Sequence, residues 1–162
     1  MPMRIAVFSD THGRTDGMIR TIRVEKPDAV IHLGDCERDL TTLRHEFPDV
    51  PIYSVSGNCD YHAQEPDTAF FTLENVKILA THGHRYGVKM SLDPMLNAAY
   101  FGGAKLVLYG HTHLSYNKDE LGIRIMNPGS AGMGARCTYG LVHIEKGMVL
   151  SCAVKPIPAE PV

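Results

Sequence analysis

The sequence has no apolar run that is long enough to cross a membrane. A transmembrane helix needs about 20 consecutive apolar residues, and no stretch of this 162-residue chain approaches that length. The N-terminus also lacks the basic segment and cleavage site of a secretory signal, because residues 4–8 read as a strand that leads directly into a polar motif. We therefore expect a cytoplasmic protein that has no membrane partner.

Two compositional signals of other protein classes are absent. The four cysteines (Cys36, Cys59, Cys137 and Cys152) form no C-x-x-C pair, which argues against a zinc ribbon and against a disulfide framework. The formal net charge is −2, so the chain lacks the excess of Lys and Arg typical of proteins that coat nucleic acids. We expect reduced thiols and no dedicated nucleic-acid surface.

Length and composition fit one globular domain. The chain is 44% hydrophobic and 21% charged, and it contains no internal repeat or low-complexity tract. Three prolines fall within the last seven residues, and proline cannot pair in a central strand. We predict a single domain over residues 1–155 and a flexible tail over residues 156–162.

The first two-thirds of the chain alternates short apolar runs with helical patterns. The runs are rich in β-branched residues and bounded by Gly, Pro or Asp, as expected of buried strands; they cover residues 4–8, 29–33, 52–55, 76–80 and 106–109. Helical patterns cover residues 16–26, 39–47 and 91–101, the last with Ser91 as the N-cap candidate. This alternation predicts βαβ units and a mainly parallel sheet.

The last third of the chain changes to strands joined by tight turns. Residues 116–118, 123–126, 139–144 and 148–154 read as strands, and the turns at 120–122 and 145–147 each end in glycine. These strands are expected to be antiparallel. The sequence therefore predicts an α/β domain in which a second, meandering sheet packs on the first.

Acidic, amide and imidazole groups follow the five predicted parallel strands. They are Asp10 and His12, Asp35, Asn58, His82 and His84, and finally His111 and His113, in the order of the strands. The carboxyl ends of parallel strands meet at one edge of a sheet, where sites are commonly found. We therefore expect these groups to lie together.

The chemistry of this set favours a pair of divalent metal ions. Two carboxylates, one amide oxygen and four or five imidazoles without thiolate suit Mn, Fe, Co, Ni or Zn, and seven or eight groups are too many for one tetrahedral ion. Two ions about 3.5–4 Å apart clamp a phosphoryl group during in-line displacement. Taken singly, the Asp-x-His and Gly-Asp pieces are ordinary turn or capping sequences, but their common placement favours a metal site.

The remaining histidines fit structural roles. His32 lies inside an apolar strand and is expected in the core, or behind the site. His45 falls on the exposed face of a helix, and His143 falls in a late strand. His62 follows the third polar motif, and the pattern assigns it no role.

These motifs, from residues 8–13 to the Asn-Pro-Gly-Ser stretch at 127–130, resemble the calcineurin-like metallophosphoesterase family. The chain resembles in particular the small YfcE-type phosphodiesterases of that family and their relative, the retromer scaffold subunit of eukaryotes. The resemblance covers nearly the whole chain. It implies two packed β-sheets flanked by helices, a four-layer αββα sandwich, with a dinuclear metal site.

The resemblance also implies a ligand set. One ion would be held by Asp10, His12, Asp35 and His113, and the other by Asp35, Asn58, His82 and His111, so that Asp35 bridges the two. A hydroxide between the ions would attack the phosphorus. Besides their metal contacts, Asp35, Asn58 and His12 are expected to act in catalysis together with His84. The 127–130 stretch is expected to shape the pocket wall.

One position departs from the pattern of many relatives. Cys59 stands where they have a histidine that helps the leaving group, although the YfcE-type branch often shows cysteine there. His84 is then a candidate general acid, and a water molecule is another. Arg14, Arg38 and Arg85 adjoin the motifs and are candidates for binding phosphate or for exposed surface positions.

We therefore predict a metal-dependent phosphodiesterase that acts on a small phosphate ester, with manganese as the preferred metal and Ni²⁺, Co²⁺, Fe²⁺ or Zn²⁺ as alternatives. A phosphomonoesterase or nucleotidase on the same site, and a non-catalytic scaffold of the same fold, are the competing functions. The complete ligand set argues against the scaffold. The sequence leaves open the physiological substrate and whether the protein forms a homo-oligomer.

Overall fold

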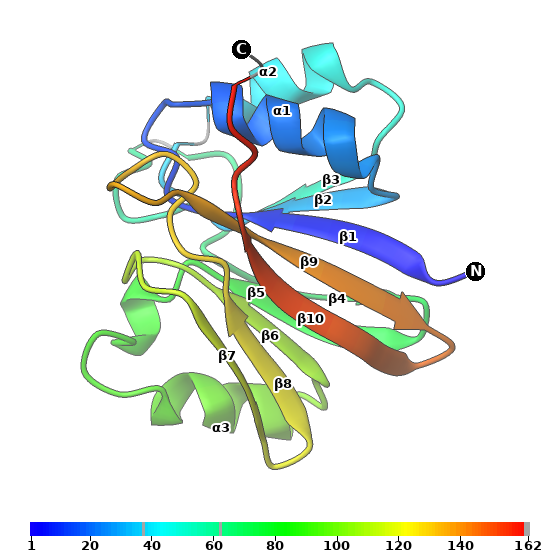
Figure 1. Ribbon diagram of the computed structural model, residues 1–162. Coiled ribbons are helices and arrows are strands. Elements are labelled where there is room, and N and C mark those ends of the chain that lie inside the picture. Colours follow the sequence, from blue (N-terminus) through cyan, green and yellow to red (C-terminus); the bar gives the residue numbers. More distant parts are fainter. Residues whose placement is uncertain (37, 62, 161–162) are drawn as a thin grey trace.

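Two five-stranded sheets form the centre of the molecule (Figure 1). The computed structural model describes residues 1–36, 38–61 and 63–160. The first sheet has the order β10 (Met148–Pro156), β9 (Thr138–Glu145), β1 (Met3–Phe8), β2 (Ala29–His32) and β3 (Ile52–Ser54). The second has the order β4 (Thr68–Leu73), β5 (Val76–Thr81), β6 (Leu106–Tyr109), β8 (Ile123–Asn127) and β7 (Tyr116–Glu120).

Each sheet is mixed, and this corrects the predicted arrangement. Strands β1, β2 and β3 are parallel in one sheet, and β5, β6 and β8 are parallel in the other. The late strands do not form a sheet of their own. Strands β9 and β10 extend the first sheet antiparallel to β1, whereas β7 and β8 complete the second.

The main core lies between the two sheets. Side chains alternate along a strand, so Ile5 and Val7 of β1 point to the inner face and meet Ile78 of β5 and Leu108 of β6 in one buried cluster. The intervening residues of β1, Ala6 and Phe8, point to the outer face. Both faces of β1 are therefore covered.

Helices cover the two outer faces and complete the four-layer αββα sandwich (Figure 1). Met18 and Ile22 of α1 (Asp16–Glu25) and Leu43 of α2 (Asp39–Glu46) pack on the first sheet. Met95 and Ala99 of α3 (Asp93–Phe101) pack on the second. In the described part of the chain, no helix has the length and apolar character needed to span a bilayer.

The predicted α/β class, the three helices and the nine predicted strands are confirmed to within a few residues. Strand β4 was not predicted, although it forms a hairpin with β5 through Glu74 and Asn75, both at positive φ. Ser91 is not the N-cap of α3; Leu92 takes that position, and the hydroxyl of Ser91 accepts a hydrogen bond from the N–H of Asp93.

The chain beyond β10 remains in contact with the domain up to Glu160. The N–H of Ile157 donates to the carbonyl of Cys137 at 3.0 Å, and its side chain packs on the α1 side of the first sheet. Arg20 donates to the carbonyl of Pro158. Residues 161 and 162 of the predicted flexible tail lie outside the described residues, and the flexibility of the tail stays a prediction.

A buried carboxylate ties α1 to the first sheet. Glu25 is 8% exposed, and its carboxylate accepts hydrogen bonds from Tyr139 of β9 at 2.5 Å and from Lys155 of β10 at 3.1 Å. Arg4 of β1 lies 2.5 Å from the other oxygen. Burial by itself raises the pKa of Glu25, but these donors and charges outweigh burial and lower the pKa below 4.5.

We predict that Tyr139→Phe lowers the free energy of unfolding by about 2 kcal/mol at pH 7, because a hydrogen bond to a buried charge is lost. Because the folded state has the lower pKa, the contribution of Glu25 is full above the unfolded-state pKa and is lost as the pH falls through the folded one. Urea unfolding at pH 7 and pH 3 measures both effects. Tyr100→Phe is the exposed control; a wild-type stability and pH dependence in Tyr139→Phe contradicts the assignment.

Candidate dinuclear metal centre

The polar residues that follow five strands meet at one place between the two sheets. Asp10 and His12 follow β1, Asp35 follows β2 and Asn58 follows β3; His82 follows β5, and His111 and His113 follow β6. The strand ends belong to both sheets rather than to a single sheet edge, which corrects that part of the prediction. Face-to-face packing of the sheets is what brings the two sets of loops together.

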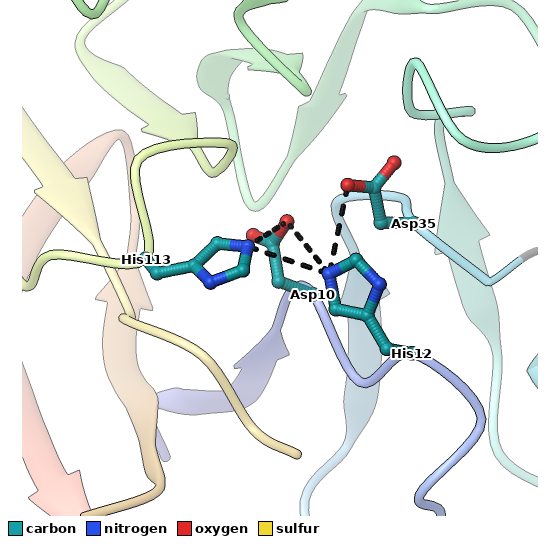
Figure 2. A group of neighbouring side chains, drawn as sticks. All are labelled: Asp10, His12, Asp35 and His113. Atoms are coloured by element: carbon teal, nitrogen blue, oxygen red, sulfur yellow. Dashed lines mark hydrogen bonds and ion pairs between the residues drawn. The ribbon is translucent and has the colours of Figure 1, made fainter. Parts of the chain in front are cut away.

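One group comprises Asp10, His12, Asp35 and His113 (Figure 2). Each residue offers one ligand atom, and these atoms all lie within 4.8 Å of one another. The Nε2 atom of His113 lies 3.2 Å from Oδ1 of Asp10 and 3.3 Å from Nε2 of His12. Two imidazole nitrogen atoms and one carboxylate oxygen atom thus lie around a common centre.

A second group comprises Asp35, His82 and His111, within the same distance limit. The Nε2 atom of His82 lies 3.4 Å from Oδ2 of Asp35 and 3.1 Å from the side-chain oxygen of Asn58. Asp35 belongs to both groups, as a bridging carboxylate would. The structure thus brings together all seven predicted ligands, and their coordination of metal stays a prediction.

One buried oxygen atom of the site supports the binding of a cation. Oδ1 of Asp10 is buried and has no hydrogen-bond donor among the described residues. It lies 3.2 Å from His113, 3.8 Å from His82 and 3.9 Å from His12, measured to each Nε2. A buried oxygen without a donor costs free energy, and a metal ion among these atoms would remove that cost.

The backbone is bent at most of these residues. Positive φ angles occur at Asp10, His12, Asp35, His111 and His113. Such angles are uncommon outside glycine, cost about 1–3 kcal/mol each and cluster at functional sites. Here they turn alternate side chains of one loop, such as His111 and His113, toward a common centre.

Two glycines allow the backbone to approach the carboxylates. A Cβ atom on Gly57 would lie 2.1 Å from Oδ1 of Asp35, and one on Gly110 would lie 2.0 Å from Oγ of Ser9 and 2.9 Å from Oδ2 of Asp10. Any larger residue at either position would displace a candidate ligand.

Hydrogen bonds fix the orientation of the candidate ligands. Oδ2 of Asp10 accepts from the hydroxyl of Ser9 and from the N–H of His111. Oδ1 of Asp35 accepts from the N–H of Cys59 at 3.0 Å. Nδ1 of His82 donates to the carbonyl of Leu33 at 2.7 Å, which orients Nε2 toward the site.

The charges of the site perturb one another. Burial raises the pKa of Asp10. Burial alone would also raise the pKa of Asp35, but the hydrogen bond and charge of His82 bring it below its ordinary value. Burial lowers the pKa of His82, but Asp35 and Asp10 outweigh it and raise that pKa. Burial and the charge of His82 lower the pKa of His111 to about 4.

A buried network behind the site was not found from the sequence. The carboxylate of Asp39, at the start of α2, accepts from the hydroxyl of Thr11 and lies 3.1 Å from Nε2 of His32; Nδ1 of His32 accepts from the N–H of Gly34. The network joins the loop of Asp10 and His12 to the loop of Asp35. It also confirms His32 as a satisfied residue in the core behind the site.

Side chains of the Asn-Pro-Gly-Ser stretch hold the ligand loops. The side chain of Asn127 donates to the carbonyl of Gly110 and to the hydroxyl of Thr112. The hydroxyl of Ser130 donates to the carbonyl of Asp10 at 2.7 Å. The contribution of this stretch to the pocket wall stays a prediction.

The histidines that are not predicted metal ligands lie in different environments. The ring of His84 lies 5.4 Å from that of His82 and 6.1 Å from that of His111, and its Nδ1 is buried without a hydrogen-bond partner among the described residues. Burial, with the charge of His82, lowers the pKa of His84. His45 is exposed as predicted, and His143 contacts Ser151. The prediction for His62 lies outside the described residues.

The three arginines are placed differently from one another. Arg85 forms an ion pair with Asp67. Arg14 lines a cavity of about 1180 Å³ between α1 and the C-terminal segment. Arg38 lines a cavity of about 580 Å³ that reaches His12, Asp35 and Cys59. Of the three, Arg38 alone shares a cavity with candidate metal ligands.

The fold and the candidate metal site are those of a phosphoesterase. The chain belongs to the calcineurin-like phosphoesterase superfamily, because the model of that domain matches residues 3–147. Among its relatives is the Bacillus subtilis protein named "Probable metallophosphoesterase YsnB", which is 33% identical over 130 residues, or 79% of this chain and 75% of that protein. Phosphodiesterase YfcE of Escherichia coli is 29% identical over 120 residues, 67% of this chain and 61% of that protein.

Solved structures agree on the fold. A conserved "predicted phosphoesterase" from Streptococcus pneumoniae TIGR4 has a TM-score of 0.74 at 29% identity and covers 96% of this chain and 98% of its own. Vps29 of Entamoeba histolytica complexed with zinc has a TM-score of 0.74 at 18% identity, over 96% of this chain and 100% of its own, which shows the fold alone.

We predict that Ser9→Ala weakens metal binding about 10–100-fold, as is typical when a hydrogen bond to a ligand is removed. Titration of manganese, followed by calorimetry or electron paramagnetic resonance, measures the change. Ser54→Ala is the matched control, because the buried hydroxyl of Ser54 has no hydrogen-bond partner among the described residues. Equal affinities in the two variants would show that Ser9 does not orient a ligand.

Proposed function

We propose that this chain hydrolyses phosphodiesters with the help of two divalent metal ions. The observation that carries the proposal is the pair of histidine and carboxylate groups that share Asp35 and surround an oxygen of Asp10 without a donor. Membership of the phosphoesterase superfamily supports it, as do relatives that are named phosphodiesterases.

The ions would be held by Asp10, His12, Asp35 and His113 on one side, and by Asp35, Asn58, His82 and His111 on the other. Bound there, two divalent ions would lower the pKa of a bound water molecule and would neutralise charge on the phosphoryl oxygens. Manganese is proposed as the metal, and Ni²⁺, Co²⁺, Fe²⁺ and Zn²⁺ suit the same nitrogen and oxygen donors.

The protein would position the ester with side chains on the open side of the site. His12 and Asn58 are exposed, whereas Asp10, Asp35 and His82 are buried, so the substrate would approach past His12. His84 stands beside the second group and would donate a hydrogen bond from its ring to a phosphoryl oxygen. Asp35 would keep both sides of the centre at a fixed separation.

A diester suits this site better than a monoester. It brings one negative charge less, so fewer cationic donors are needed around the phosphoryl group. In addition, the side chain beside Asn58 is the exposed thiol of Cys59, which is a weak hydrogen-bond donor. A phosphomonoesterase or nucleotidase on the same residues is the second candidate, and a non-catalytic scaffold is disfavoured by the seven assembled donors.

We also propose that the protein is located in the cytoplasm. The four cysteines are free, which agrees with a reducing compartment such as the cytoplasm. A homo-oligomer is left open, and size-exclusion chromatography with light scattering would determine the state.

We predict that the protein loaded with Mn²⁺ hydrolyses bis(4-nitrophenyl) phosphate and that Asp35→Asn loses nearly all of this activity. The substitution removes the negative charge that would serve both ions. Steady-state rates with diesters, monoesters and cyclic nucleotides over several metals measure this, with Asp93→Asn as an exposed control. A wild-type enzyme that is inactive on every diester, or an Asp35→Asn variant with normal turnover, contradicts the proposal.

We further predict that the rate depends steeply on the leaving group. A thiol is a poor proton source, and general acid help contributes about 10²–10⁴-fold. In a series of aryl diesters, the slope of log kcat/KM against leaving-group pKa should be steep in the wild type and in Cys59→Ala, and shallower in Cys59→His.

A flat wild-type slope, with chemistry shown to limit the rate, would mean that another side chain acts as the acid. His84→Ala should then steepen the slope, because His84 is the imidazole beside the second group that is not a predicted ligand.

A further inference from the structure

The cavity beside the candidate metal centre has one wall made by α2. Arg38 precedes the helix, and Arg38, Thr41 and Arg44 recur at intervals of three residues, which places them along one stripe of a helix surface. All three side chains are exposed and line the cavity. His12, Asp35 and Cys59 line the same cavity. The cavity thus contains candidate metal ligands together with a pair of guanidinium groups.

The carboxylates that line this cavity already have partners within the protein or are candidate metal ligands. Oδ2 of Asp60 accepts hydrogen bonds from the N–H groups of Asp35 and Gly57, at 2.9 and 2.8 Å. Glu65 lies 3.6 Å from Arg44. Asp35 is the candidate bridging ligand.

The side chain of Arg38 hydrogen-bonds to Cys36, and among the described residues no carboxylate forms an ion pair with its guanidinium, whereas Arg44 is paired with Glu65. The guanidinium of Arg38 therefore retains N–H donors for a ligand. Guanidinium is suited to phosphate because it presents parallel N–H donors in a planar fork.

An aromatic ring stands at the same cavity. The side chain of Tyr61 is 84% exposed, although it lines the cavity together with the buried Leu40. An exposed aromatic ring beside a cationic group is a surface on which a nucleobase stacks, worth about 1–3 kcal/mol in single-strand binding proteins.

We propose that this cavity binds one arm of the substrate diester and that the arm is a nucleoside bearing a second phosphate. The reacting phosphate lies at the metal centre, the base lies against Tyr61, and the second phosphate is bound by Arg38. The inference rests on the proposed phosphodiesterase function and narrows its substrate class.

The test compares two chromogenic diesters that differ by one phosphate: the 4-nitrophenyl ester of thymidine 5′-phosphate, and the same ester carrying a 3′-phosphate. Both release 4-nitrophenolate. We expect the 3′-phosphate to lower KM about tenfold at unchanged kcat, the signature of binding that is equal in ground and transition states. Equal KM values, or a higher KM for the 3′-phosphate, would overturn the proposal.

Arg38→Ala and Arg38→Gln should remove this tenfold preference, so that the two thymidine esters have equal KM values in each variant. Arg23→Ala is the matched control, because it removes an exposed positive charge from α1 and lines neither cavity. Tyr61→Ala should raise KM for both thymidine esters by the same factor. A preference that survives both Arg38 variants overturns the role of Arg38, and unchanged KM values in Tyr61→Ala overturn the role of the ring.

Calorimetry provides a readout that does not depend on turnover. Thymidine 3′,5′-bisphosphate should bind the manganese-loaded protein about tenfold more tightly than thymidine 5′-phosphate, and Arg38→Ala should remove the difference. The two failures are distinguishable. Inactivity on every diester contradicts the phosphodiesterase function, whereas turnover of bis(4-nitrophenyl) phosphate without any 3′-phosphate effect contradicts only the assignment of this cavity.

Discussion

Two buried carboxylates in one small volume are the constraint on which the rest of the structure depends. Asp10 and Asp35 have ligand atoms within 4.8 Å of each other, and both residues are at most 3% exposed. Like charges at this distance out of water are unfavourable unless positive charge lies between them. The charge of His82 meets part of this requirement. The uncompensated oxygen of Asp10 shows that part of it remains, and a metal ion is the group that fits.

The fold is arranged to keep that unfavourable site assembled. Parallel strands of two sheets end at the same place, and the inter-sheet core fixes their separation. Positive φ angles at Asp10 and His111, and the close approach of Gly57 to Asp35, all cost conformational freedom. The stability of the sandwich meets this cost, since strained positions persist only where the surroundings over-determine them.

The positions of the strands and of the polar residues after them could be predicted from the sequence. The assignment of the late strands to one sheet or the other could not. The ends of the strands and the residues after them follow from apolar runs and turn residues, so Asp10, Asp35 and His82 could be located. The sharing of late strands between two sheets could not, because β8 has an apolar pattern that suits either sheet and only its pairing with β6 decides. The Thr11, His32 and Asp39 network was missed for the same reason, since it joins three separate segments.

The candidate metal ligands and the wall of the neighbouring cavity are held by different parts of the structure. The seven candidate ligands lie on loops that are held by buried groups such as Ser9 and Asn127. The cavity wall, by contrast, includes exposed side chains at and along α2, such as Thr41 and Arg44, and Arg44 is paired with Glu65. Substitution of such side chains costs little stability, because exposed residues contribute little to folding. Under the proposed function, selectivity for one arm of the ester could therefore change without displacing the candidate metal ligands.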